Sequence, residues 1–216
     1  MKNIILSLLS LCFFTGIAAA QTNRFEANIA AFEKEDQITP VDKNVIVFTG
    51  SSSIVKWKTL KEDMTGKNVI NRGFGGSNTK DLIEFADRVI SAYHPKQVII
   101  YEGDNDLKLG RMPDEVFNDF KILFQKIRAK DKGVRISFIS IKPSPSRREL
   151  LANTQLTNSL ISAFLKTQPK TDYIDVFNPM LNPSGQFMPK LYVADSLHMT
   201  DEGYKIWTRV VKPYVR

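Results

Sequence analysis

Near the end of the chain, Asp195 precedes His198 by three residues in the segment Asp195-Ser-Leu-His198. The chain has two histidines, and only this one follows an acidic residue so closely. An aspartate that fixes the tautomer of a histidine and stabilises its charged form makes up two-thirds of a hydrolytic triad. The same spacing also suits an aspartate that caps a turn beside a buried imidazole. The assignment therefore depends on a nucleophile elsewhere in the chain.

Candidate nucleophiles stand upstream, where Ser51, Ser52 and Ser53 follow an apolar run and Gly50. A serine directly after a buried strand is well placed for nucleophilic attack. Serines at such a position also cap helices, which is the structural alternative. The nucleophile elbow Gly-x-Ser-x-Gly is absent because Ile54 occupies the place of its second glycine, which argues against an α/β-hydrolase. The residues alone leave the choice among the three serines open.

Two further loops contain groups that could stabilise an oxyanion. In residues 73–76, Gly-Phe-Gly-Gly, glycines allow a backbone N–H to approach an anion closely. A dinucleotide site is not favoured there, because Asn78 replaces the third glycine of that motif. In residues 102–106, the Asn105 amide can donate to a developing oxyanion, as acyl transfer requires. The three carboxylates of this segment lack EF-hand spacing and a histidine cluster, which argues against a metal site.

The elements that must position these residues alternate along the chain. Strands are predicted at residues 45–48, 69–70, 97–101, 134–141 and 173–176, and helices at 24–36, 79–91, 113–130, 147–166 and 201–211. This alternation favours one parallel sheet with helices on both faces. In such sheets the ligand site lies at the carboxyl ends of the strands, so the loops above should meet there. We expect a single domain over residues 21–216.

Residues 1–20 have the pattern of a secretory signal peptide, with Lys2, an apolar core and three alanines before Gln21. Its removal predicts an exported, secreted or periplasmic protein with no integral membrane segment. Cys12 is the only cysteine, so the processed chain would have no disulfide. A lipoprotein anchored at Cys12 stays open, although Leu11 occupies a position where a small residue is expected.

The chain has 30 Lys and Arg against 23 Asp and Glu, a net charge of +7, with both signs mixed along the sequence. The nearest approach to a basic cluster is Lys142 with Arg147 and Arg148. This distribution does not indicate nucleic-acid binding, although it could favour an anionic substrate. The sequence gives no indication of the oligomeric state.

Four segments together resemble the SGNH, or GDSL-type, hydrolase superfamily, which is named for Ser, Gly, Asn and His in successive blocks. The segments are residues 47–54, 71–76, 103–106 and 195–198, and the resemblance spans almost all of residues 21–216. The first block departs from the Gly-Asp-Ser-Leu pattern, because Ser51 stands in the place of its Asp. This correspondence puts the nucleophile at Ser52. Trp57 resembles the aromatic residue that closes the block in acetylhydrolase-like members.

The resemblance implies a flavodoxin-like α/β/α sandwich with a five-stranded parallel sheet. It also implies a serine mechanism in which Ser52 attacks an ester, His198 takes its proton and Asp195 orients the imidazole. The oxyanion would be held by the backbone N–H groups of Ser52 and Gly76 and by the Asn105 side chain. No metal or organic cofactor is needed.

The expected substrate is a short acyl ester, first of all an O-acetyl group on carbohydrate. A lysophospholipase or lipase-like acylhydrolase is the second hypothesis, and a non-catalytic carbohydrate-binding protein the third. Phe74, Trp57 and Met188 could line a pocket, although such residues more often belong to the core. Arg72 and Glu102 flank the predicted site, and either could contact the substrate or simply form a salt bridge.

Overall fold

The structure is a computed structural model that describes residues 23–216, so the predicted signal peptide, Cys12 and the cleavage position before Gln21 lie outside it. Within the described range, none of the helices combines the length and the apolar character that crossing a bilayer requires. The described residues build one sheet and the helices that cover it.

Five short strands form a fully parallel sheet in the order β2-β1-β3-β4-β5. Their bounds are β1 Ile46–Gly50, β2 Val69–Gly73, β3 Gln97–Tyr101, β4 Arg135–Ile139 and β5 Thr171–Ile174. Every residue of β1 and β3 is buried, as expected for central strands covered on both faces. The strand order is that of flavodoxin-like sheets, which confirms the predicted fold. It also puts the point where the order reverses, and where ligands usually bind, between β1 and β3.

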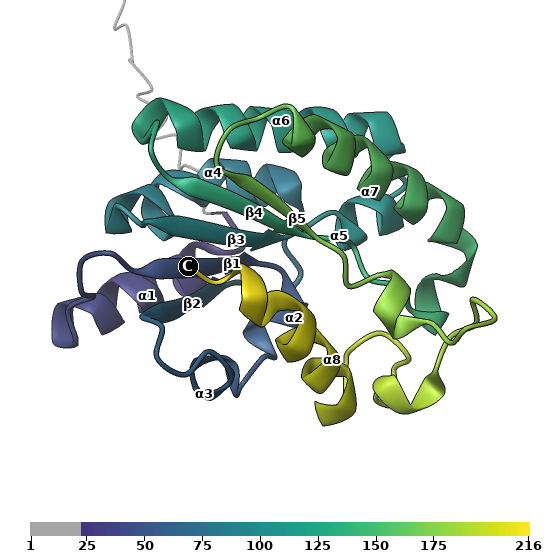
Figure 1. Ribbon diagram of the computed structural model, residues 1–216. Helices are drawn as coiled ribbons and strands as arrows, with labels where there is room; N and C mark the ends of the chain where they lie inside the picture. The colour runs from purple at the N-terminus through teal and green to yellow at the C-terminus, as the bar shows by residue number, and fades with distance from the viewer. Residues whose placement is uncertain (1–22) are drawn as a thin grey trace, which may run out of the picture.

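Helices pack on both faces of the sheet (Figure 1). Their bounds are α1 Glu26–Ile38, α2 Ser52–Val55, α3 Leu60–Asp63, α4 Thr79–Val89, α5 Asp104–Lys108, α6 Pro113–Lys130, α7 Leu151–Lys166 and α8 Asp201–Val211. Alternate residues of each strand face opposite cores: Val47 packs with α4, α6 and α7, whereas Ile46 and Phe48 pack with α3 and α8. Each face therefore has its own apolar core.

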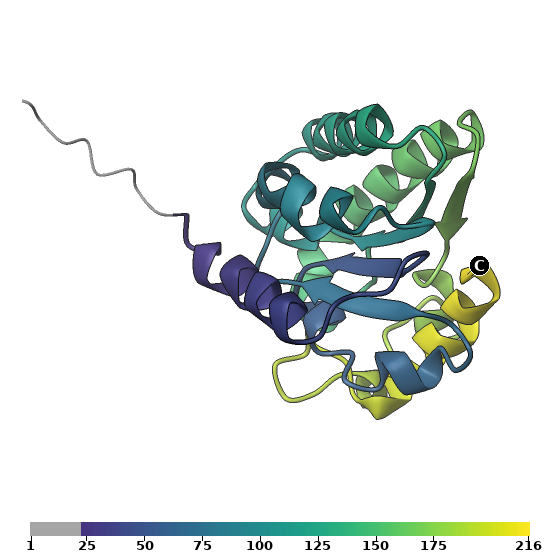
Figure 2. The same cartoon turned by 90° about the vertical axis from the view of Figure 1, so that its left-hand side faces the viewer.

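The helix α1 lies against the β2 side of the molecule, beside α4 (Figure 2). Its side chain Ile29 is fully buried, and the Phe25 ring meets the Phe74 ring edge-on at 5.0 Å. Arg72 of β2 pairs with Asp36 of α1 and donates to Tyr93 Oη at 2.7 Å. Arg72 thus connects α1 to the sheet through an ion pair, which is the salt-bridge alternative that the sequence left open.

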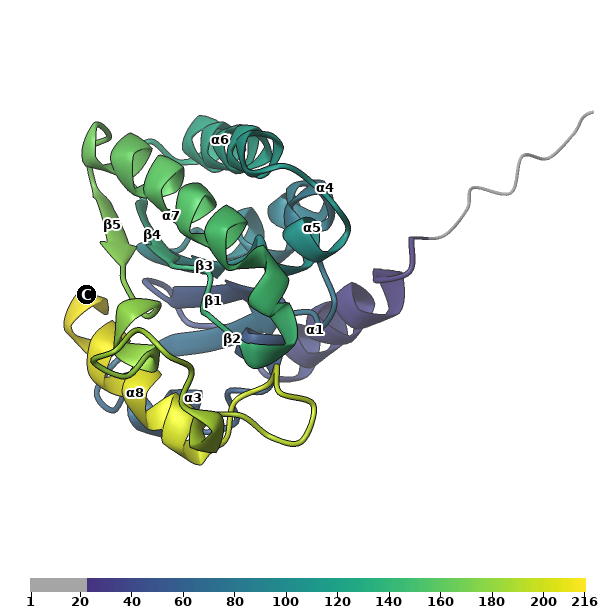
Figure 3. The ribbon, with the colours of Figure 1, turned by 90° about the vertical axis from the view of Figure 1, so that its right-hand side faces the viewer.

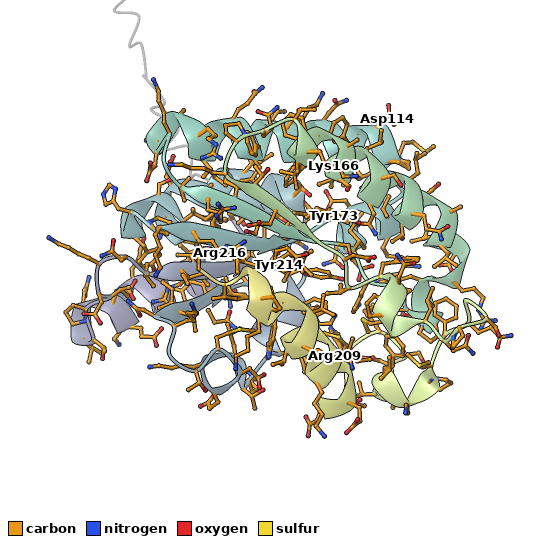
Figure 4. The ribbon with its side chains drawn as sticks, viewed as in Figure 1. Asp114, Lys166, Tyr173, Arg209, Tyr214 and Arg216 are labelled. Carbon is orange, nitrogen blue, oxygen red and sulfur yellow. The ribbon has the colours of Figure 1, made fainter. Side chains whose placement is uncertain are left out.

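The C-terminal residues cover the opposite end of the sheet from the loops of interest. Gln97, at the start of β3, donates to Tyr214 O at 2.8 Å and accepts from Arg216 N–H at 2.9 Å. Arg216 Nη2 also lies 3.9 Å from Asp172 Oδ1 of β5, and Figure 4 labels Arg216 and Tyr214 at the C-terminal end of the chain. The C-terminal residues therefore cover the amino end of β3, at the opposite edge of the sheet from the loops that contain the candidate site residues.

Several predicted boundaries were wrong by two to four residues, among them those of β2, α7 and β5. The helix predicted from residue 147 begins at Leu151, after a 3₁₀ turn over Pro145–Leu150 in which Arg147 has a non-helical φ of −119°. The last strand lies at 171–174 instead of 173–176. The short helices α2, α3 and α5 were not predicted, because four or five residues are too few to show a helical period.

Candidate active site

The three serines lie where β1 ends and α2 begins, and the structure separates their surroundings. Ser51 and Ser53 are buried, with 2% and 3% of their surface exposed, whereas Ser52 is only partly buried. Gly50 makes the tight exit from the strand with φ +127°, and a side chain there would lie 2.0 Å from Tyr101 O. The first turn of α2 therefore presents the Ser52 hydroxyl at the carboxyl end of the sheet.

Ser52, His198 and Asp195 form a line of hydrogen-bonding groups. Ser52 Oγ lies 2.9 Å from His198 Nε2, and His198 Nδ1 lies 2.5 Å from Asp195 Oδ2. Because the carboxylate can only accept, we assign the imidazole proton to Nδ1, which leaves Nε2 free to accept from the serine hydroxyl. Of the three candidate serines, Ser52 is the one in contact with the histidine.

Asp195 also organises the turn that contains His198. Its Oδ1 accepts from the backbone N–H groups of Leu197 and His198, each at 2.9 Å. Ser196, between them, adopts a left-handed conformation with φ +56°. Although slight desolvation opposes ionisation of this exposed side chain, these bonds and that from the imidazole hold the pKa of Asp195 well below its usual range. Turn capping and histidine orientation are thus two roles of one carboxylate.

The helix α8 ties the histidine turn to the serine. Thr200, directly after the turn, accepts from Gly203 N–H at 3.4 Å and so caps the start of α8. One turn further on, Tyr204 Oη donates to Ser53 O at 2.9 Å. Ser52 and His198 are 146 positions apart in the chain, and the contact of α8 with α2 keeps them close together.

The loop after β2 lies against the serine. A side chain built on Gly75 would lie 3.7 Å from Ser52 Cβ, an ordinary van der Waals contact, so the two residues are neighbours. Gly76 has φ +87°, a conformation that favours glycine. Among residues 23–216, neither Ser52 N–H nor Gly76 N–H donates to another backbone group. Both are thus available as the anion donors that the sequence predicted.

Asn105 lies at the same edge, at the start of α5, but its amide is already engaged. Its Nδ2 donates to Ser51 Oγ and to Ser77 O, both at 2.8 Å. The next residue, Asp106, accepts the Thr79 N–H with both carboxylate oxygens, at 3.1 and 3.0 Å. Asn105 and Asp106 therefore both fix the loop after β2. Asn105 also contacts Ser51, the residue before Ser52. Sequence reasoning missed these contacts, although it singled out the Gly-x-Asn-Asp block that makes them.

The carboxylates of residues 102–106 have separate partners. Glu102, 2% exposed, accepts from Ser77 Oγ, while Asp104 faces Lys142 and Arg147. Burial, helped by the nearby Asp106, raises the pKa of Glu102 well above its ordinary value. Within the described residues, no group of three or more acidic, histidine or cysteine side chains is arranged to hold a metal ion.

Two of the candidate pocket residues are core residues. Trp57 and Phe74 are each 1% exposed, and their rings pack against neighbouring aromatic rings on opposite faces of the sheet. Met188 is partly buried against the same core as Trp57. His94 is exposed at the end of a 3₁₀ turn, away from the Ser52 site. The aromatic residues therefore support the sheet and do not line the site.

Comparison with known protein families gives a match over most of the chain. A model of the GDSL-like lipase/acylhydrolase family matches residues 47–206, which include all four blocks. No curated protein sequence matches the chain at a significant level.

Several solved structures are similar in fold. A GDSL-like lipase from Bacteroides thetaiotaomicron superposes with a TM-score of 0.73 at 23% identity, covering 88% of this chain and 97% of that chain. A carbohydrate esterase of family 3 from Talaromyces cellulolyticus gives 0.64 at 15% identity, with 79% and 95% covered. A lipase/acylhydrolase from Enterococcus faecalis gives 0.62 at 18%, with 80% and 97% covered. At these identities the similarity establishes the shared fold.

Proposed function

Because this chain belongs to the GDSL-like lipase/acylhydrolase family, as the four sequence blocks indicated, we propose that it is an exported serine esterase acting on short-chain carboxylic esters. The observation that most supports this proposal is the 2.9 Å contact between Ser52 Oγ and His198 Nε2, continued by Asp195 on the other ring nitrogen. A serine hydroxyl in that position can lose its proton to the imidazole while it attacks a carbonyl carbon.

In the proposed mechanism, Ser52 Oγ attacks the ester carbonyl and His198 takes its proton. The N–H groups of Ser52 and Gly76 stabilise the oxyanion, with a contribution from the Asn105 amide. His198 then gives the proton to the leaving alcohol, and Asp195 stabilises the imidazolium meanwhile. A water molecule, activated by the same histidine, releases the acid from the acyl-enzyme.

We propose O-acetyl groups on carbohydrate as the substrate. Export and the acetylhydrolase-like first block support this choice, and the fold shared with a family 3 carbohydrate esterase is compatible with it. The family also includes lipases, so the length of the acyl chain distinguishes the two hypotheses. Export itself is tested by N-terminal sequencing of the protein recovered outside the cytoplasm, which should begin at Gln21.

The test is hydrolysis of p-nitrophenyl acetate, butyrate and octanoate by the wild type and by Ser52→Ala and Ser53→Ala. We expect activity to fall with chain length, and Ser52→Ala to lose roughly 10⁴-fold or more. The neighbouring Ser53→Ala is the matched control and should stay within about tenfold, because Ser53 is buried away from the histidine.

A preference for octanoate would replace the acetyl hypothesis by the lipase one. Full activity in Ser52→Ala, with an unchanged circular dichroism spectrum, would reject the serine mechanism. Activity on the acetate that depends on Ser52 would justify assays with acetylated polysaccharides.

A further inference from the structure

A buried group of charges lies next to the proposed active site, in the loop between β4 and α7. Lys142 Nζ lies 3.4 Å from Asp104 Oδ2, and Arg147 Nε lies 3.5 Å from Asp104 Oδ1. The side chains of Lys142, Asp104 and Arg147 are 1%, 12% and 16% exposed. Two cations thus share one carboxylate, at distances longer than those of well-formed ion pairs.

Polar atoms without partners surround this cluster. Ser144 Oγ, Ser146 Oγ and Arg147 Nε are buried and make no hydrogen bond within the described part of the chain. Buried polar groups in folded proteins are nearly always paired. Here the two hydroxyls have no partner among the described residues, and Arg147 Nε has only its long ion pair with Asp104. All three can donate a hydrogen bond. The loop therefore concentrates unused donors beside an excess positive charge.

The cluster adjoins the proposed triad on its histidine side. Ser146 N–H donates to Ser196 O at 3.1 Å, inside the turn that contains His198. The Tyr192 hydroxyl, also from that segment, donates to Pro143 O at 2.6 Å. Figure 3 shows the 3₁₀ turn before α7 beside the loop that leads to α8. On the other side, Asp104 immediately precedes Asn105.

Charge balance indicates what this cluster would bind. A charge removed from water is costly unless an opposite charge compensates it, and here two cations face a single carboxylate. The remaining charge of +1 matches one carboxylate group, and the planar guanidinium of Arg147 suits a carboxylate geometrically. Asp104 stays between the cations and would repel an anion that approached it, so the ligand must contact the outer side of Arg147.

We propose that the outer side of Arg147, backed by the charge of the buried Lys142, forms a subsite for a carboxylate on the alcohol part of the ester substrate. This inference rests on the proposed esterase function. The alcohol part is chosen because the leaving oxygen must face His198 Nε2, and the loop of Arg147 contacts the turn of His198. An O-acetylated sugar acid has the required chemistry, with an acetyl ester and a carboxylate on one sugar.

The test compares two aryl acetates whose para substituent is either a carboxylate or its uncharged methyl ester, 4-acetoxybenzoate and methyl 4-acetoxybenzoate, with release of acetate as the readout for both. The quantity measured is the ratio of their kcat/KM values in the wild type, Arg147→Gln, Arg147→Lys and Arg148→Gln. Because one ratio is compared among variants, the intrinsic reactivities of the two esters cancel. Arg148→Gln is the matched control, since Arg148 is the exposed neighbour and lies over the Phe187 ring.

We expect Arg147→Gln to lower the ratio about tenfold or more, as for a lost charge-assisted hydrogen bond. Arg147→Lys should restore part of the ratio, and Arg148→Gln should leave it at the wild-type value. An unchanged ratio in Arg147→Gln overturns the inference, as does an equal loss in Arg148→Gln.

If Arg147→Gln does not fold, inhibition of the wild type tests the carboxylate subsite instead. We expect 4-hydroxybenzoate to inhibit p-nitrophenyl acetate hydrolysis more strongly than methyl 4-hydroxybenzoate does, and equal or weaker inhibition overturns the carboxylate subsite. Ser52-dependent hydrolysis with no charge preference rejects this subsite alone. Absence of Ser52-dependent hydrolysis rejects the proposed function, and the subsite with it.

Discussion

The side-chain amide of Asn105 donates a hydrogen bond to Ser51 Oγ at 2.8 Å, one residue before the proposed nucleophile. Its other N–H is directed to Ser77 O. An oxyanion formed at Ser52 must therefore share one of these N–H groups with its present acceptor. Ser51 stands where the family pattern has aspartate, and a neutral hydroxyl is a weaker acceptor than a carboxylate. With Ser51 in place of the aspartate, the Asn105 amide is therefore held less strongly and can turn more easily to an oxyanion at Ser52.

This arrangement predicts different effects for the two residues. Asn105→Ala should lower kcat for p-nitrophenyl acetate by about 10²–10³-fold, because a donor to the transition state is lost. Ser51→Ala should stay within roughly tenfold of the wild type, because Ser77 O still holds the amide. Steady-state kinetics of both variants make the comparison. Equal and complete loss in Ser51→Ala would instead identify Ser51 as the nucleophile.

Asp195→Asn tests the orientation of the imidazole. Asparagine is isosteric and its oxygen can still accept from the Leu197 and His198 N–H groups, so the turn should persist. The amide cannot stabilise an imidazolium as the carboxylate does, and it can favour the wrong tautomer. We expect kcat to fall by roughly 10²–10⁴-fold at pH 7–8 with little change in melting temperature. A variant that retains wild-type kcat would show that His198 needs no carboxylate.

The strands were predictable because β1 and β3 are short apolar runs followed by glycine and small polar residues. The short helices on which the site residues lie were harder to predict than the strands. Ser52 and Asn105 lie on helices of four and five residues, which are too short for a periodic pattern. The Asn105–Ser51 contact joins residues 54 apart, and it exists only because β1 and β3 are neighbours in the sheet.

The open and the wrong predictions have physical causes too. The sequence left Trp57 and Phe74 as pocket or core residues, and both belong to the core, where burial of a large ring is stabilising. The helix boundary near Arg147 was set too early. Pro143 and Pro145 favour extended backbone in the residues before them, and the resulting turn is what brings Arg147 to Asp104.

Glu102 predicts a dependence of stability on pH. Its pKa is raised in the folded protein by burial, so the folded state retains a proton that the unfolded chain loses above about pH 4.3. Its contribution is therefore greatest below that pH, and the free energy of unfolding falls as pH rises towards the folded-state pKa. The slope is at most about 1.4 kcal/mol per pH unit.

Glu102→Gln removes this titration while keeping an oxygen that can accept from Ser77 Oγ. Between pH 5 and 7, urea unfolding should show a smaller loss of stability in the variant than in the wild type. Glu149→Gln, the same change at an exposed position, is the control and should follow the wild type. Parallel curves for wild type and Glu102→Gln would mean that Glu102 is ionised in the folded protein.

Gly50 gives the sharpest test of how the serine is presented. At φ +127°, a side chain would meet Tyr101 O at 2.0 Å, and that carbonyl belongs to the backbone of a central strand and accepts from Ser51 N–H. Gly50→Ala should therefore destabilise the protein by roughly 3 kcal/mol or more, or prevent folding. Gly185→Ala is the matched control, since Gly185 has φ +74° with nothing within 4 Å of an added side chain. It should cost only the roughly 1–2 kcal/mol of a left-handed residue. Chemical denaturation measures both, and equal costs would show that the strand exit can move to admit a side chain.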